Sequence, residues 1–302
     1  MNIESTGVTV DLNELTSVRV SDPDAIRRAW SRRVRRSTIT TDGRLFLVAA
    51  DHTARGMFAA SGDPIAMANR QELLERLVLA LSVPGVDGVL GSADILDDLA
   101  LLGVLDDKVV AGTMNRGGLM GASWELDDRF TAYDAKHIVE YGLDFGKMLI
   151  RIEDTDPGVA RTLEACAHAV QELADQKVPT MVEPLPYQLI DGKAALLRDD
   201  VALLRAVTVA AGLASSSAYS WLKVPAWSDV RLMAQATSQP MLLLGGDPGA
   251  EIEAAFDAWA RALAEPTVRG LTVGRAMLYP PDGDVAAVVA RAARLVRPDM
   301  KD

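Results

Sequence analysis

Cysteine and histidine are scarce in this chain of 302 residues, which contains one cysteine and three histidines. A single cysteine excludes an intrachain disulfide and a metal site built from thiolates. The three histidines, His52, His137 and His168, are dispersed along the chain, which argues against a histidine-rich metal site. We therefore expect neither a metal ion nor a cofactor. Cys166 lies in a helical pattern, and we expect it to be a buried apolar residue.

The chain also lacks an excess of positive charge and any long apolar run. Its formal net charge of −11 disfavours nucleic acid or an anionic membrane as the main partner. No stretch approaches the roughly 20 apolar residues of a membrane span. Residues 1–15 are acidic and have no apolar core of the kind found in a secretory leader. We expect a cytoplasmic protein that holds any anionic substrate with a local cluster of positive groups.

Hydrophobic residues make up 49% of the chain, which is enough for a large core. Residues 1–43 are interpreted as a lead-in that packs on the main domain. Within it, AIRRAWSRRVRR places Ile26, Trp30 and Val34 on one helical stripe and six arginines elsewhere. This pattern predicts an N-terminal helix docked by its apolar stripe, with a solvated basic face.

From Arg44 onward, short apolar runs rich in β-branched residues alternate with longer segments of helical periodicity. Eight runs are predicted strands: 44–51, 86–92, 108–114, 147–153, 178–184, 219–225, 239–246 and 268–274. Buried parallel strands read as nearly unbroken apolar runs and need a crossover helix between each pair. Eight such units predict an α/β fold with a single (β/α)8 TIM barrel over residues 44–302. An open doubly wound sheet is the alternative, but no dinucleotide or P-loop motif follows the first strand.

Polar residues and glycines collect where these strands end, and in a barrel that is where the chemistry takes place. They are Asp51, Asn115, Arg116, Lys147, Arg151, Glu183, Lys223, Gly245, Gly246, Gly274 and Arg275. Lys147 and Arg151 are four residues apart on one strand and therefore point to the same side of the sheet. We interpret this group as the candidate active site.

Lys223 is unusual because it interrupts the apolar and aromatic run AYSWLKVPAW. A lysine attacks a carbonyl only as the neutral amine, and burial together with a second cation such as Lys147 would lower its pKa. The iminium so formed is an electron sink that lets a nearby carbon–carbon bond break. Asp51 and Glu183 are the carboxylates available to move protons. The alternatives are that Lys223 reaches solvent and that Lys147 forms a structural ion pair with one of the carboxylates.

The glycine turns GGDPG and GRA predict a phosphate site. Backbone N–H groups at Gly245, Gly246 and Gly274, with the guanidinium of Arg275, could cradle a phosphate after the last two strands, as barrels often do. The partner expected from this pattern is a small phosphorylated sugar.

Five segments of the chain resemble a known family: ADHTARG, GKMLIRIED, TMVEPLPY, WLKVP and GLTVGRAMLY. They resemble the class I aldolases of the DeoC/LacD type, which include tagatose-bisphosphate, sulfofructose-phosphate and archaeal-type fructose-bisphosphate aldolases. The resemblance implies a (β/α)8 barrel without a metal and Lys223 as the Schiff-base residue. It also implies Lys147, Glu183 and Asp51 as active-site partners, and Arg275 in the phosphate site. By analogy with such barrels we expect a homo-oligomer.

The chain further resembles an actinobacterial subgroup associated with inositol breakdown. This implies cleavage of 2-deoxy-5-keto-6-phosphogluconate into dihydroxyacetone phosphate and malonate semialdehyde, with Arg116 or Arg151 receiving the carboxylate. Three features depart from the family: Val224-Pro225, the MNRGG segment, and an acidic, helical insert at 122–142. The alternatives are a tagatose- or fructose-bisphosphate aldolase, a deoxyribose-phosphate-type aldolase, and a non-catalytic barrel that binds sugar phosphates.

Overall fold

The computed structural model describes residues 6–115, 117–227, 229–247 and 249–300. Nine strands form one sheet, and eight of them are parallel. The strands are β1 Leu45–Ala49, β2 Gly88–Gly91, β3 Val109–Thr113, β4 Phe145–Ile152, β5 Thr180–Ile190, β6 Lys193–Leu196, β7 Ser220–Pro225, β8 Met241–Leu244 and β9 Val268–Val273.

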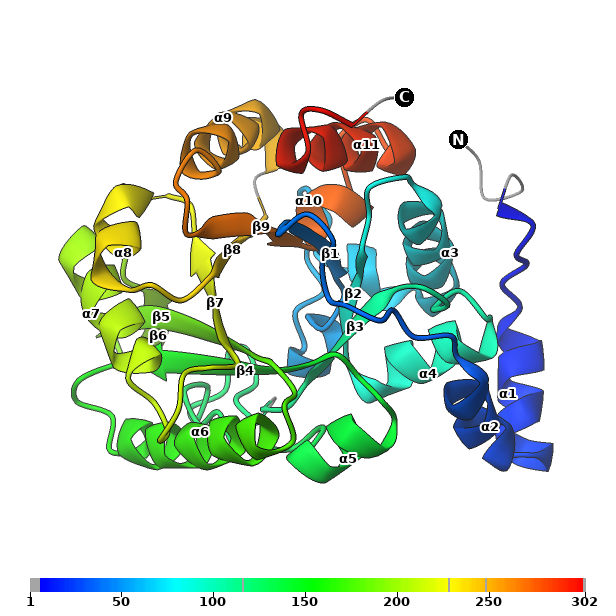
Figure 1. Ribbon diagram of the computed structural model, residues 1–302, viewed down its shortest axis with the longest axis horizontal. Coiled ribbons are helices and arrows are strands. Elements are labelled where there is room, and N and C mark those ends of the chain that lie inside the picture. The colour runs from blue at the N-terminus through cyan, green and yellow to red at the C-terminus, as the bar shows by residue number, and fades with distance from the viewer. Residues whose placement is uncertain (1–5, 116, 228, 248, 301–302) are drawn as a thin grey trace.

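The parallel strands close into a ring, because β1 pairs with β9 at one end of the strand order and β4 pairs with β5 at the other. Around the ring the order is β1-β2-β3-β4-β5-β7-β8-β9. Figure 1 shows this ring with helices outside it. The predicted (β/α)8 barrel is confirmed, and each of its eight predicted strands overlaps an observed one.

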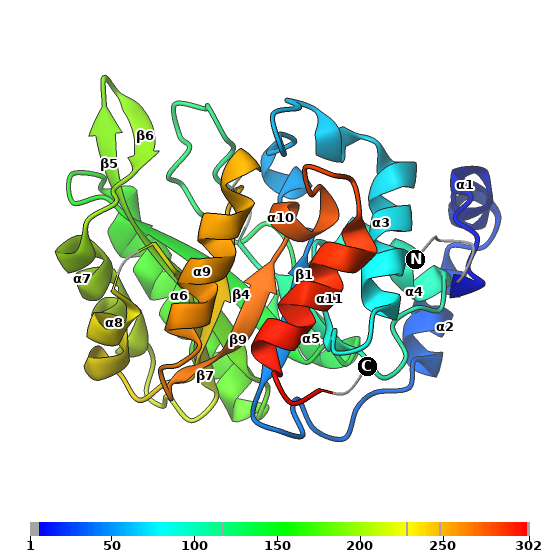
Figure 2. The same cartoon turned by 90° about the horizontal axis from the view of Figure 1, so that it is seen from above.

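Helices alternate with the strands and cover the outside of the barrel, as Figure 2 shows from a second direction. They are α1 Leu12–Ser21, α2 Asp24–Arg32, α3 Arg70–Ser82, α4 Ala93–Leu101, α5 Ala135–Glu140, α6 Gly158–Asp175, α7 Asp200–Ala211, α8 Val230–Ala236, α9 Ile252–Ala262, α10 Arg275–Leu278 and α11 Val285–Val296. Short 3-10 helices lie at η2 Thr53–Arg55, η3 Ala66–Ala68 and η4 Gly249–Glu251. Aspartate begins several of the α-helices; the side chain of Asp199, for example, accepts the backbone N–H of Ala202 at the start of α7.

Two apolar layers hold the barrel together. The larger one lies between the strands and the surrounding helices. The smaller one fills the inside of the barrel and includes Leu45, Leu47, Ala111, Phe145 and Leu242. Inside, the rings of Phe145 and Trp221 meet edge to face with their centroids 5.8 Å apart. These side chains close the amino-terminal half of the barrel to water, so that a cavity can open only at its other end.

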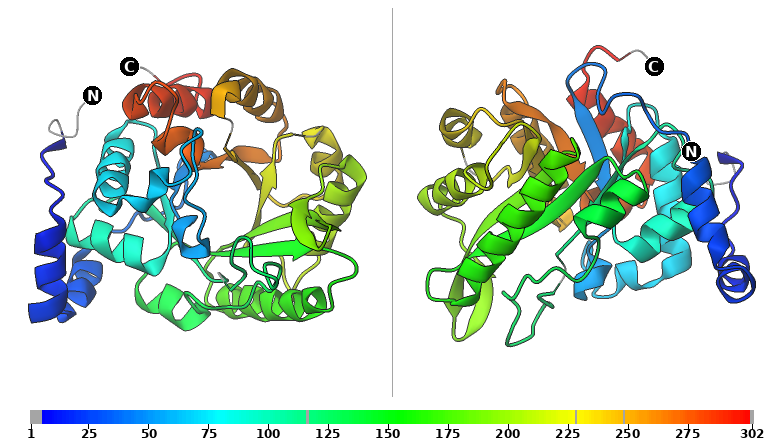
Figure 3. Two further views of the ribbon diagram at one scale, coloured as in Figure 1. Left: turned by 180° about the vertical axis from the view of Figure 1, so that it is seen from behind. Right: turned by 60° about the horizontal axis from the view of Figure 1, so that its bottom comes forward.

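The segment between β3 and β4 differs from the prediction of a helical insert at 122–142. Only α5 is helical there, and most of residues 117–134 form turns and irregular loop. In the left view of Figure 3 this loop and the loop that follows β1 lie over the opening of the barrel.

Strand β6 was not predicted. It forms an antiparallel hairpin with the end of β5, and the turn residues Asp191 and Gly192 both have positive φ angles. An Asp-Gly pair between two strand-like runs is the usual signal for such a turn, so the sequence contained the information.

The lead-in forms two helices, α1 and α2, on the outside of the barrel next to α4 (Figure 1). Trp30 is buried as predicted, but α2 ends at Arg32 and Val34 is 54% exposed. The basic face is only partly solvated. The buried guanidinium of Arg33 pairs with Asp144 at 2.7 Å and donates to the carbonyls of Gly142 and Lys108. Asp144 in turn accepts the N–H of Val110 at the start of β3, so α2 is tied to the amino-terminal end of the barrel.

Replacing Arg33 by methionine should lower the free energy of unfolding by about 3–5 kcal/mol, because it leaves the Asp144 carboxylate buried with only the more exposed Arg35 as an ionic partner. The matched control is Arg27→Met, since Arg27 is 65% exposed and its pair with Glu140 lies on the surface. The control should change stability by about 1 kcal/mol or less. Urea denaturation measures both, and equal effects of the two substitutions would contradict the prediction.

Candidate functional site

A cavity of about 320 Å³ opens at the carboxyl end of the barrel. Its walls come from the ends of β1, β4, β5, β7, β8 and β9 and from the loop that follows β3. The lining residues are Ala49, Asp51, His52, Arg55, Met57, Met120, Glu125, Leu149, Glu183, Leu185, Tyr187, Ala194, Leu196, Lys223, Trp227, Leu244, Gly245, Gly246, Thr272, Gly274 and Arg275. Apolar walls with a few convergent polar groups are typical of a small-molecule site.

Four of the predicted residues meet at the base of this cavity. Glu183 on β5 lies between two lysines: one carboxylate oxygen is 3.3 Å from Nζ of Lys223, and the other is ion-paired with Nζ of Lys147. Nζ of Lys147 is also 3.5 Å from Asp51. Lys147 and Asp51 are each 1% exposed, while Lys223 and Glu183 are 5% and 8% exposed. The cluster is therefore well buried, and Asp51, Glu183 and Lys223 line the cavity.

Strand alternation explains why these side chains point inward. Phe145 and Trp221 fill the barrel interior, and Lys147 and Lys223 lie two residues further along the same strands, on the same face. Each lysine therefore stands one layer above an aromatic ring. Its ammonium group emerges where the apolar filling ends, and there the carboxylate of Glu183 lies near both lysines and that of Asp51 lies near Lys147.

A second group of predicted residues lines the cavity at the ends of β8 and β9. Gly274 must be glycine, because a Cβ atom there would lie 2.2 Å from the carbonyl oxygen of Ala49. Gly246 has a φ of 74°, which favours glycine. The guanidinium of Arg275 is 4.0 Å from Asp247, and its buried Nε has no hydrogen-bond partner among the described residues. This wall therefore offers backbone N–H groups and a weakly neutralised cation to an anionic group.

Two predicted substrate-binding residues are placed elsewhere. The side chain of Asn115 forms two hydrogen bonds with the backbone of Leu149 and lies 3.9 Å from Sγ of Cys166 on α6, so it does not line the cavity. Arg151 is fully buried and holds Asp128 with two hydrogen bonds of 2.9 and 2.8 Å. The expectation that Arg151 receives a substrate carboxylate therefore lacks support, because its guanidinium is already engaged. Arg116 lies outside the described residues.

The cavity also contains polar residues that the sequence did not single out as substrate-binding groups. Buried polar atoms of His52, Trp227 and Thr272 have no hydrogen-bond partner among the described residues. Arg55 lines the cavity as well, although it is only 5% exposed. His52 and Arg55 follow the first strand closely, so their positions in the sequence were a usable signal. Thr272 and Trp227 could be found only from the structure.

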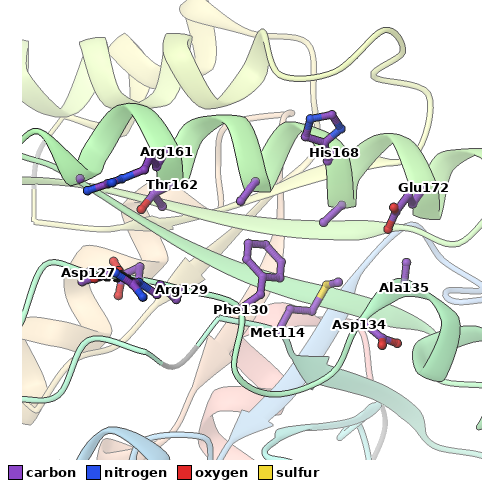
Figure 4. Close-up of a pocket in the computed structure, with 14 residues that line it drawn as sticks. Met114, Asp127, Arg129, Phe130, Asp134, Ala135, Arg161, Thr162, His168 and Glu172 are labelled. Carbon is purple, nitrogen blue, oxygen red and sulfur yellow. Dashed lines mark hydrogen bonds and ion pairs between the residues drawn. The ribbon is translucent and has the colours of Figure 1, made fainter.

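A larger cavity of about 590 Å³ lies outside the barrel, between the 127–135 segment and α6. Figure 4 shows Arg161, His168 and Glu172 projecting from the helix, opposite Phe130 and Met114. Neither buried lysine lines it. The chemistry that the lysine cluster permits is therefore confined to the smaller cavity.

Within residues 6–115, 117–227, 229–247 and 249–300, no group of three or more His, Cys, Asp or Glu side chains is placed to hold a metal ion. Over the same residues, no helix has the length and hydrophobicity needed to cross a bilayer.

Comparison with protein families gives a match over residues 43–293 to the Cgl0159-like family. The chain belongs to this family. Cgl0159 from Corynebacterium glutamicum (Brevibacterium flavum), known from a crystal structure, is 50% identical to it with a TM-score of 0.92. That alignment covers 96% of this chain and 97% of Cgl0159.

This Cgl0159-like protein shares its fold with fructose-bisphosphate aldolases. A Schiff-base-forming fructose-1,6-bisphosphate aldolase is 17% identical with a TM-score of 0.64, over 90% of this chain and 99% of the aldolase. A fructose-bisphosphate aldolase from Slackia heliotrinireducens is 14% identical with the same TM-score, over 100% of this chain and 92% of the other. None of the curated proteins matches the chain.

The lowered pKa of His52 should make the stability of this Cgl0159-like protein depend on pH. Burial, and then the nearby charges of Arg275 and Lys223, hold the pKa of His52 well below 6.5. Below pH 6.5 the unfolded chain takes up a proton at this histidine that the folded protein does not, so stability falls as the pH is lowered. Because His52→Gln lacks this contribution, its stability relative to the wild type should rise by about 2 kcal/mol between pH 7 and pH 5. Urea denaturation at both pH values measures the change, and a constant difference would contradict the prediction.

Proposed function

We propose that the protein is a class I aldolase that cleaves a phosphorylated ketose or keto-sugar acid through a Schiff base on Lys223. The observation that carries the proposal is the arrangement of Lys223, Glu183 and Lys147. The buried amine of Lys223 faces the cavity with a carboxylate 3.3 Å away, and a second buried lysine holds that carboxylate from the other side.

The proposed reaction begins when the neutral amine of Lys223 attacks the substrate ketone. Loss of water gives an iminium, and the proton of a hydroxyl on the β-carbon is then removed as the bond between the α- and β-carbons breaks. The aldehyde half leaves, and the electron pair of the broken bond forms an enamine on Lys223. Protonation of the enamine carbon and hydrolysis release the ketone half and restore the amine.

Glu183 and Asp51 are the groups assigned to the proton transfers. Both carboxylates line the cavity, as a group that exchanges protons with the substrate must, and Glu183 is the better placed because it also reaches Lys223 directly. Lys147 lies between both carboxylates, with its Nζ 3.5 Å from Asp51 and ion-paired with Glu183. Its role in the proposal is electrostatic, whereas Lys223 forms the covalent bond.

The substrate's phosphate is assigned to the wall formed by Gly245, Gly246, Gly274 and Arg275. The unpartnered Nε of Arg275 supports this assignment, because a buried cation with an unused donor is stabilised by an anion. The best single substrate is 2-deoxy-5-keto-6-phosphogluconate, which would give dihydroxyacetone phosphate and malonate semialdehyde. The fold shared with a Schiff-base-forming aldolase supports the reaction type and leaves the sugar to experiment.

Borohydride reduction in the presence of dihydroxyacetone phosphate should attach the reduced ketone covalently to Lys223. Mass spectrometry of the digested protein locates the adduct, and Lys223→Met is the control that should show none. Turnover of a phosphorylated keto-sugar should fall at least about 10³-fold in that variant, since it removes the nucleophile. Stabilisation by sugar phosphates in both proteins, without adduct or turnover in either, would identify a non-catalytic binding protein instead.

Glu183→Gln should lower kcat by about 10²–10⁴-fold, as expected for loss of a general acid–base group. The amide keeps the size of the side chain, so the fold and the binding of the phosphate should survive. Steady-state kinetics measure kcat, and binding of inorganic phosphate is the control. A kcat within threefold of the wild type would remove Glu183 from the mechanism and leave Asp51 as the proton-transfer residue.

A further inference from the structure

Arg55 differs from the other buried arginines of this chain. Arg33 pairs with Asp144, and Arg151 pairs with Asp128. Arg55 is just as buried, yet it forms no ion pair with any described residue. Its side chain makes one hydrogen bond within the described chain, from Nε to the carbonyl oxygen of Gly118 at 3.0 Å.

A buried guanidinium without a directly paired carboxylate is costly, because burial disfavours its charge and the carboxylates of Asp128 and Glu183 act on it only from a distance. Burial, and then the neighbouring charge of Arg151, lower the pKa of Arg55. The side chain is nevertheless fixed in position by Gly118 and lines the cavity. Both terminal nitrogens of the guanidinium are left without a protein acceptor among the described residues. An anion in the cavity would supply the missing partner.

The position of Arg55 separates it from the proposed phosphate site. The β4 and β5 side of the cavity carries Leu149, Leu185 and Tyr187, and the guanidinium of Arg55 lies toward this side, near Arg151 and Tyr187. The phosphate wall belongs to β8 and β9, and β9 also pairs with β1, which Arg55 follows, so the direction of the Arg55 guanidinium and not the strand order separates the two cationic groups. A substrate bound through Lys223 therefore extends from one cationic group toward the other.

We propose that Arg55 is a specificity-determining residue that binds a carboxylate on the half of the substrate released as the aldehyde. This inference rests on the proposed function. It makes the substrate a keto-sugar acid with a phosphate at one end and a carboxylate at the other. A ketose bisphosphate or a deoxyribose phosphate does not meet this requirement.

A carboxylate fits this position better than a second phosphate. One guanidinium can hold one carboxylate through two parallel hydrogen bonds. The same part of the cavity contains Glu125 and Glu183, whose charges oppose a dianion more strongly than a monoanion. By contrast, the phosphate wall combines two glycine turns with an arginine.

The test uses binding of 6-phosphogluconate, glucitol 6-phosphate and mannitol 1,6-bisphosphate, measured by isothermal titration calorimetry. All three probes share one phosphate. At the opposite end, 6-phosphogluconate carries a carboxylate, glucitol 6-phosphate carries no charge and mannitol 1,6-bisphosphate carries a second phosphate. None has a ketone, so binding does not require a Schiff base. In the wild type, 6-phosphogluconate should bind at least about tenfold more tightly than glucitol 6-phosphate, the size expected for a hydrogen bond to a charged group. Arg55→Gln should remove this difference in affinity. The Kd of glucitol 6-phosphate for the variant should stay within twofold of its Kd for the wild type.

Arg55→Lys keeps the charge but loses the two-point contact, so it should retain part of the preference for 6-phosphogluconate over glucitol 6-phosphate. This second variant also keeps the test valid if Arg55→Gln fails to fold. Arg231→Gln is the matched control, because Arg231 is exposed and pairs with Asp229 away from the cavity. Equal weakening of all three probes in Arg55→Gln would make Arg55 structural and overturn the proposal. A preference for the bisphosphate that depends on Arg55 would overturn the carboxylate assignment.

The borohydride experiment separates this inference from the function it rests on. Failure of dihydroxyacetone phosphate to label Lys223 in the wild type would refute the aldolase proposal, whatever the calorimetry shows. Labelling of Lys223 in both wild type and Arg55→Gln, without any carboxylate preference in the wild type, would refute the role of Arg55 alone.

Discussion

The arrangement on which this active-site proposal depends is one carboxylate shared by two buried lysines. Burying an ammonium group costs several kcal/mol unless a charged partner is fixed beside it, and Glu183 is fixed by β5 between Lys147 and Lys223. The closed barrel makes this possible, because β4, β5 and β7 are neighbours and direct every second side chain to the same interior. The apolar filling beneath keeps water out, so the electrostatic interactions are strong where the proposed reaction takes place.

The two ends of the barrel use charge in different ways. At the amino-terminal end, buried carboxylates such as Asp87 and Asp144 meet arginines and also accept backbone N–H groups of β1 and β3. These groups are satisfied, and they fasten α2 and the final helix to the strands. At the carboxyl end, Arg55 and Arg275 have guanidinium N–H groups without an acceptor in the part of the chain that the structure describes, and both residues line the cavity. The fully paired charges at the amino-terminal end hold the fold together. The incompletely paired guanidinium groups at the carboxyl end are available to bind a ligand.

The sequence predicted the barrel well because its signals are local. A short, nearly unbroken apolar run predicts a buried strand, and Lys223 lies within such a run. The path of a long loop, by contrast, depends on contacts with residues that are distant in the sequence. Arg151 was expected at the cavity because its strand position was right, but the segment after β3 folds back and delivers Asp128 to it. Asn115 was also expected at the cavity, but its side chain bonds to the backbone of Leu149. The direction of this side chain depends on the path of the backbone at the end of β3.

The same loop explains why the substrate was harder to predict than the reaction. Lys147, Glu183 and Lys223 lie on strands of the barrel, a fold that is shared with aldolases of only 14–17% identity. The groups that would recognise the remainder of the substrate come from the ends of β1 and β5 and from the segment after β3. By holding Arg151 with Asp128 while offering Arg55 only the carbonyl of Gly118, that segment decides which guanidinium is neutralised. Selectivity in this cavity therefore depends on how the protein pairs its own charges before any ligand arrives.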